Sequence, residues 1–156
     1  MLQRIQTVYL LLAFALCIVC LCLPVAHLTP ADSYGMSTID VFNLWISCEG
    51  AHIFWYCPVM MGILVIATAL IFLDVWLYRQ RALQMRLCTF SMILLVAWYI
   101  AYGIIIYMML HTGDAPESWR PHWSAALPAA ALVLCYLAFR CILKDEMLVR
   151  SLDRLR

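Results

Sequence analysis

Histidine is the residue type in this chain best suited to hold a transition metal or a haem, and each of the four copies borders an apolar stretch. They are His27, His52, His111 and His122. Imidazoles from different helices can bind one metal ion or one haem when a helical bundle brings them to the same level. No two of them have the i, i+3 or i+4 spacing of neighbours on one helix. The sequence therefore predicts no metal site and no cofactor.

Eight cysteines raise the question of redox chemistry. Four of them stand inside long apolar stretches: Cys17, Cys20, Cys22 and Cys135. Cysteine in such surroundings usually packs as a small apolar residue. Cys48 and Cys57 instead fall on the side of the membrane that we expect to be oxidising, where they are either joined by a disulfide or free. Quinone-linked disulfide oxidases with four spans use an outer CxxC motif, which this chain lacks, so that class is disfavoured.

Asp74 is the one acidic residue inside an apolar stretch. An acid within a membrane marks a proton or ion pathway by default. The position of Asp74 near the end of its stretch favours a simpler interpretation, an ion pair with Arg79, with Arg86 and Arg140 as alternative partners. The sequence leaves both interpretations open.

The elements that carry these residues follow from the composition. Hydrophobic residues make up 67% of the 156 positions, charged residues make up 12%, and the mean hydropathy is +0.93. Soluble domains have about 45–50% apolar and about 25% charged residues, so a water-soluble protein is excluded. Four stretches are long enough to cross a membrane, and we place spans at about 5–25, 55–77, 87–110 and 125–143. The predicted fold is all-α, a single membrane domain built as a four-helix bundle.

Lysine and arginine decide the orientation of such a bundle. Nine of the ten lie at the chain ends or between the second and third spans, and Arg120 is the exception. This bias predicts that both termini are cytoplasmic, in the inner membrane of a bacterium. The connection at 26–54 then becomes the longer outer loop, and its length predicts a short strand or helix within it.

Pairs of alanines four residues apart indicate which helices approach most closely. Ala97 and Ala101 form one pair, and Ala125 with Ala129 and Ala126 with Ala130 form two more. Small side chains let helix backbones meet in lipid. We therefore expect close contact between the third and fourth spans.

The charged tail at 144–156 continues the helical pattern beyond the last span. Leu148, Leu152 and Leu155 have the spacing i, i+4, i+7 and share one face of a helix. One interpretation is a flank whose basic residues anchor the span at the lipid headgroups. The other is an amphipathic helix whose leucines dock on a partner.

The tail KDEMLVRSLDRLR and the opening MLQRIQTVYLLLA carry a family resemblance. Together they resemble a family of short four-span inner-membrane proteins of the Bacteroidota, catalogued as a domain of unknown function. The resemblance covers the whole chain and implies the same topology. It brings no catalytic residues.

The chain contains none of the motifs GxSxG, HExxH or GxxxxGK[ST], and we expect no enzymatic activity. The basic residues form no patch suited to nucleic acid. The leading hypothesis is an accessory or structural membrane subunit whose partners are membrane lipids and another membrane protein or a second copy of itself. The alternatives are a redox or haem/quinone-associated membrane protein and a small transporter.

Overall fold

The structure, a computed structural model, describes residues 2–30, 39–43, 46–48, 51–53, 58–77, 80–111 and 116–153. Four long helices account for most of them: α1 (Leu2–Cys22), α2 (Pro58–Trp76), α3 (Arg81–His111) and α4 (Leu127–Asp153). All four are long and apolar enough to cross a membrane. This confirms the prediction of four such helices in a mostly helical protein.

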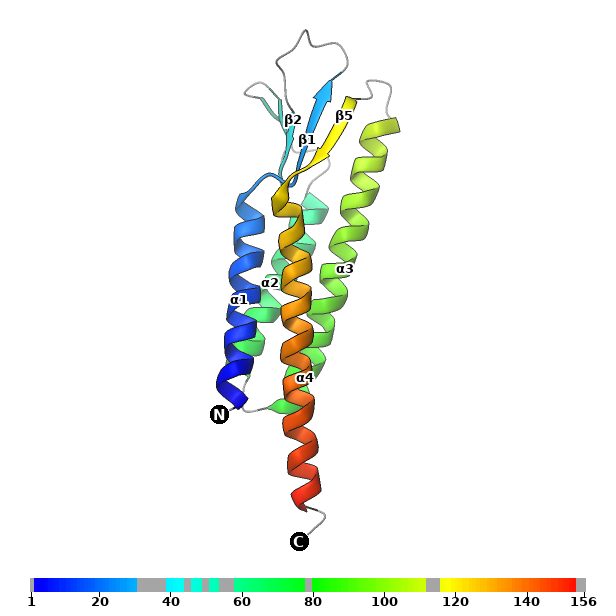
Figure 1. The fold of residues 1–156 in the computed structure, drawn as a ribbon. Helices are drawn as coiled ribbons and strands as arrows, with labels where there is room; N and C mark the ends of the chain where they lie inside the picture. The colour runs from blue at the N-terminus through cyan, green and yellow to red at the C-terminus, as the bar shows by residue number, and fades with distance from the viewer. Residues whose placement is uncertain are drawn as a thin grey trace.

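The helices lie side by side, with a small sheet beyond one end and both chain termini at the other (Figure 1). We call these the sheet end and the termini end. Helix α1 contacts α2 and α4, and α3 contacts the same two helices, so the four surround a common core. The proline at the first position of α2 fits there, because the first N–H groups of a helix have no partner within it.

Small buried side chains line the most extensive contact, which joins α1 to α4. Helix α1 buries residues three or four positions apart, and so does α4: Leu10, Ala13, Cys17 and Cys20 from the first, and Ala131, Cys135, Ala138 and Ile142 from the second. This spacing places each set on one helix face. Alanine and cysteine let the two backbones approach, which matters in lipid because apolar burial alone does not drive helices together.

The alanine pairs of the sequence analysis indicate the wrong face of α4. Ala126, Ala129 and Ala130 are exposed, and the buried face carries Ala131 and Ala138 instead. Helix α3 does contact α4, and Tyr99 contributes a hydrogen bond from its hydroxyl to the carbonyl of Ala125 at 2.6 Å. Alanines occur on several faces of α4 in this region, so the four-residue spacing alone could not identify the buried face.

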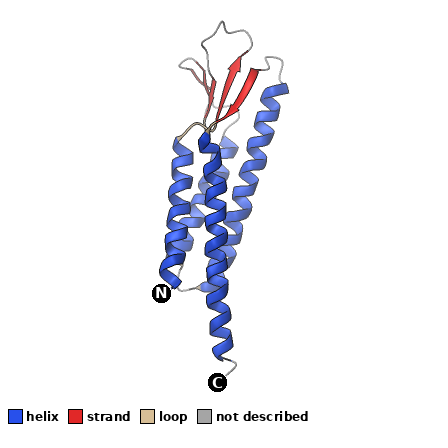
Figure 2. Cartoon of the chain, viewed as in Figure 1, coloured by secondary structure: helices blue, strands red, loops and turns tan. Residues whose placement is uncertain are grey.

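A five-stranded antiparallel sheet corrects the all-α prediction (Figure 2). Its strands are β1 (Ala26–Pro30), β2 (Ile39–Val41), β3 (Ile46–Cys48), β4 (Ala51–Ile53) and β5 (Pro116–Pro121), in the order β4-β3-β2-β1-β5. Four strands come from the connection between α1 and α2. The fifth comes from the connection between α3 and α4, which is followed by a short 3-10 helix, Trp123–Ala126. Pairing of β1 with β5 joins segments about ninety positions apart, so local sequence patterns gave no sign of it.

Buried polar contacts tie the sheet to the helices. Asn43, just after β2, is buried, and its Nδ2 donates to the carbonyl of Cys20 at 2.7 Å. Its Oδ1 accepts a hydrogen bond from the indole Nε1 of Trp98 on α3 at 3.0 Å. The ring of Trp98 is fully buried and stacks on Tyr102, whose hydroxyl donates to the carbonyl of Val25 at 3.3 Å. Because a buried polar group is costly without a partner, these bonds fix how the sheet sits on the helices.

Candidate functional site

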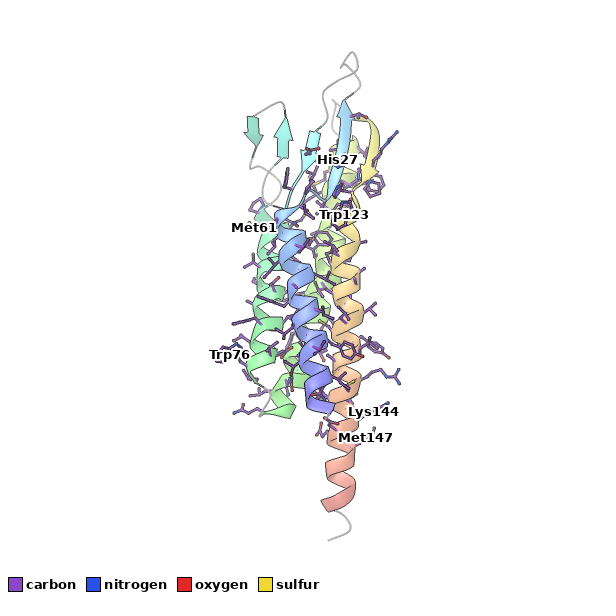
Figure 3. All side chains as sticks on the ribbon, turned by 60° about the vertical axis from the view of Figure 1, so that its left-hand side comes forward. His27, Met61, Trp76, Trp123, Lys144 and Met147 are labelled. Atoms are coloured by element: carbon purple, nitrogen blue, oxygen red, sulfur yellow. The ribbon has the colours of Figure 1, made fainter. Side chains whose placement is uncertain are left out.

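Two of the four histidines meet at the sheet end. His27 lies on β1 opposite Asp40 on β2, and its Nδ1 is 2.5 Å from the carboxylate Oδ1. The two side chains are 35% and 36% exposed, so water reaches the pair. Figure 3 labels His27 beside the sheet. The rings of His27 and His122 form a T-shaped, edge-to-face contact, with ring centroids 4.9 Å apart and planes at 82°. We call His27, Asp40 and His122 the histidine cluster.

The second ring of the cluster is held from its other side. Nδ1 of His122 lies 2.9 Å from Oγ of Ser124. The hydroxyl of Ser124 is buried and donates to the main-chain carbonyl of Pro24. Nδ1 of His122 also accepts a hydrogen bond from the main-chain N–H of Ser124 at 3.4 Å, so the ring caps the short 3-10 helix that follows. The cluster is thus held by main-chain and carboxylate oxygens of the connection that follows α1.

The structure describes one further histidine ring, that of His111, and it does not join this cluster. His111 ends α3, where its ring stacks on Tyr107 with centroids 4.2 Å apart. His52 belongs to β4, and its side chain lies outside the described atoms. Across the residues that the structure describes, no three His, Cys, Asp or Glu side chains gather in a way that could hold a metal ion.

Asp74 lies deep among the helices rather than at a surface. It is 0% exposed, and neither carboxyl oxygen has a hydrogen-bond partner among the described residues. Arg79 lies outside those residues, so the predicted ion pair with it stays a prediction. The other two candidates, Arg86 and Arg140, are exposed, and the guanidinium of Arg140 lies 6.0 Å from the ring centre of Tyr136.

The described cysteines differ in how far they are buried. Cys17, Cys20, Cys88 and Cys135 are buried as free thiols, Cys141 is half-buried and Cys22 is exposed. The thiol of Cys88 on α3 donates to the carbonyl of Cys135 on α4 at 3.3 Å. The predicted disulfide falls outside the described atoms, because Cys57 is not described and only the backbone of Cys48, in β3, is. It stays a prediction.

The predicted docking tail is the continuation of α4, which runs without a break to Asp153. Near its start Nε2 of Gln6 on α1 donates to Oδ2 of Asp145 at 3.0 Å. Beyond this contact α4 extends past the other helices (Figure 1). Leu148 and Leu152 lie on this projecting part with side chains that are not described, and Leu155 follows the described residues.

A small open hollow adjoins the base of the projecting helix. It is lined by Met85 of α3 with Leu143, Glu146 and Met147 of α4. Met147 is 65% exposed, and Figure 3 shows it at the termini end next to Lys144. Methionine adapts its shape to irregular apolar contacts and is common at binding surfaces.

The comparison with protein families assigns the chain to a family without assigning it an activity. Residues 2–155 match the family described as "Domain of unknown function (DUF4293)". The chain belongs to the DUF4293 family. No curated protein matches it. The DUF4293 match covers both the head and the tail sequences that carried the resemblance, and it transfers no site residue to this chain.

Sequence reasoning missed the contacts that the sheet creates in this DUF4293 chain. His27 and Asp40 are thirteen positions apart, and their pairing depends on the register between β1 and β2. Asn43 and Trp98 are separated by fifty-five positions. The one local signal was a polar Asn43 between apolar neighbours on both sides, because a buried amide requires partners.

Proposed function

We propose that this DUF4293 chain is a multi-pass protein of the bacterial inner membrane, with both termini in the cytoplasm and the sheet on the outer side. The distribution of basic residues supports this orientation. Nine of the ten Lys and Arg residues lie near the N-terminus, around the start of α3 or from Arg140 onward, and only Arg120, in β5, belongs to the sheet. Short cytoplasmic loops carry such an excess of positive charge. The resemblance of head and tail supports an origin in the Bacteroidota.

The function that we propose is that of a non-enzymatic accessory subunit that binds another membrane protein through the projecting end of α4. The observation that carries this proposal is the extension of α4 past the three other helices (Figure 1). A helical segment of two turns in water gains little from its own hydrogen bonds, because helices shorter than about 12–15 residues are marginal alone. Its stability comes from α4 itself and from whatever covers its apolar face.

The side chains at the base of the projecting segment support a protein partner. Met147 is exposed, and the hollow beside it is apolar apart from Glu146. Leu148, Leu152 and Leu155 share a second face of the same helix and add apolar surface to it. The charges on the tail have both signs, with Lys144, Arg150, Arg154 and Arg156 set against Asp145, Glu146 and Asp153. A segment that bound only anionic lipid would be expected to carry mainly basic residues.

The test is the size of the complex after mild-detergent extraction from native membranes. The variant Leu148→Ser/Leu152→Ser/Leu155→Ser removes the apolar face of the tail. We expect it to reach the membrane in normal yield and to run as a smaller species, with loss of the same co-purifying membrane protein that the wild-type chain retains. The matched control is Arg150→Ser/Asp153→Ser, which alters the other face of the same helix without changing the net charge and should keep the complex.

Two outcomes would contradict the proposal. One is a leucine variant with unchanged complex size and unchanged membrane yield. The other is a partner that proves to be only a second copy of the chain, which would make the tail a self-association element. Loss of membrane yield in the leucine variant alone would instead assign the tail to membrane anchoring.

A further inference from the structure

Asp74 stands apart from every other buried polar side chain of the described residues. Six of the seven have a hydrogen-bond partner, and these six are Gln6, Asn43, Thr68, Gln84, Ser91 and Ser124. Asp74 has none for either carboxyl oxygen, at 0% exposure. A buried polar atom without a partner is rare in folded proteins and demands a physical explanation.

Helix geometry makes a negative charge at this position still more costly. Asp74 lies in the last turn of α2, which ends at Trp76. The last carbonyl groups of a helix carry partial negative charge, which repels a carboxylate. The buried amide of Gln84 on α3 does reach this turn, but its Nε2 donates to the main-chain carbonyl of Asp74 at 3.2 Å rather than to the carboxyl group.

No described cation offsets the charge. Arg86 and Arg140 are exposed. Among the described residues, the titratable groups near Asp74 on the neighbouring helices are thiols: Cys135 of α4 lies within electrostatic reach of Asp74, and Cys88 of α3 and Cys17 of α1 lie within reach of Cys135. A thiol buried in an apolar environment is neutral. An ionised carboxylate would therefore be an isolated buried charge, which is far more costly than a neutral carboxyl group.

We propose that Asp74 is a proton-binding site inside the membrane domain, occupied while the helices are packed as in this structure. Binding adds one proton from water to the carboxylate, forms one O–H bond and removes the negative charge. No other reactant is required. A metal cation fits the site less well, because hard cations such as calcium take about 6–8 oxygen ligands. The described residues around Asp74 offer no such set, and none of their His, Cys, Asp and Glu side chains form a metal-binding group of three.

Asp74 lies two positions before the end of α2, on the side of the chain termini. Trp76, two positions further on, is 70% exposed, and Figure 3 shows it on the outer surface of the helices towards the termini end. Helix ends fray more readily than helix interiors, so opening of the last turn of α2 is the step by which the carboxyl group would gain or lose its proton. The site is therefore expected to exchange protons with the termini side. This inference does not depend on docking by the tail.

Infrared spectroscopy of the full chain in phosphatidylcholine vesicles tests the proposal. The difference spectrum of wild type minus Asp74→Asn at neutral pH should contain the C=O stretching band of an un-ionised carboxyl group, shifted in heavy water. Asp145→Asn is the control, since Asp145 is half-exposed and bonded to Gln6, and its difference spectrum should contain carboxylate bands. Carboxylate bands in the Asp74 difference spectrum at neutral pH would overturn the proposal.

A second measurement keeps the test independent of how well the variant folds. In wild-type protein alone, the un-ionised carboxyl band should persist at neutral pH and disappear in alkaline buffer. Its absence at neutral pH would likewise overturn the proposal. Asn reproduces the shape of the neutral carboxyl group, so we expect Asp74→Asn to keep the wild-type midpoint of unfolding in dodecyl sulfate. A strongly lowered midpoint would indicate that an ionised Asp74 is needed as the partner of a cation such as Arg79.

Discussion

Replacing Asn43 with alanine should weaken the attachment of the sheet to the helices and lower the free energy of unfolding. The amide of Asn43 makes two buried hydrogen bonds, one to the carbonyl of Cys20 and one from the indole N–H of Trp98. Alanine leaves the carbonyl of Cys20 and the indole N–H of Trp98 without these partners. An orphaned buried polar group costs about 1–3 kcal/mol. With two such groups, we expect the free energy of unfolding to fall by about 2–4 kcal/mol. We take the lower part of the combined range because water that enters the site can satisfy part of the lost hydrogen bonding.

The assay is equilibrium unfolding in mixed micelles with dodecyl sulfate, followed by circular dichroism. Thr89→Ala is the matched control, because Thr89 also donates to a main-chain carbonyl, that of Met85 at 2.9 Å, but is exposed. The carbonyl of Met85 keeps its main-chain hydrogen bond within α3 when the hydroxyl is removed, so the control should change stability by less than about 0.5 kcal/mol.

A double-mutant cycle isolates the Asn43 to Trp98 bond from the packing of the indole ring. The Trp98→Phe change loses ring volume in the buried stack with Tyr102, and the cycle subtracts this loss. We expect a coupling of about 0.5–1.5 kcal/mol between the two changes. Additive single changes, together with an Asn43→Ala effect no larger than that of Thr89→Ala, would refute the argument that buried polar contacts fix the sheet.

Two further substitutions test packing and charge. Cys135→Leu adds volume to the buried contact between α1 and α4 and should lower the free energy of unfolding by about 1–3 kcal/mol in the same assay, whereas Cys22→Leu, at an exposed position of α1, should leave it unchanged. Asp40→Asn removes the charge beside His27. Because both side chains are about one-third exposed, the loss in the free energy of unfolding should stay below about 1 kcal/mol and shrink at high salt. A larger, salt-independent loss would mean that the histidine cluster is buried by a partner.

The helices of this protein could be predicted because their signal is local. Each span is a continuous apolar stretch, and the charged residues that interrupt the stretches mark their ends. Helix faces were harder to predict. Every face of each span carries apolar residues. Only contacts in the folded chain therefore distinguish Ala131, which is buried, from Ala130, which is exposed.

The sequence predicted a short strand or helix within 26–54, but the number and pairing of the strands could not be predicted because their signal is not local. Strands β2, β3 and β4 have three residues each, too few to establish an alternating pattern, and β5 contains prolines at both ends. Their pairing depends on segments that only the packing of four helices brings together. For the same reason the sequence identified His27 and His122 as candidates but could not select this pair from the four histidines. It identified Asp74, but its burial without a partner required the structure.

The orientation of the chain in the membrane is the claim on which the proposed function rests. It is tested most directly by paired reporters, a fluorescent protein that matures in the cytoplasm and a phosphatase that is active only outside, fused after Arg156 and, in a second pair, after His111. We expect fluorescence without phosphatase activity at Arg156, and phosphatase activity without fluorescence at His111. Phosphatase activity after Arg156 would contradict the account, because the projecting end of α4 would then lie outside the cell, away from any cytoplasmic partner surface.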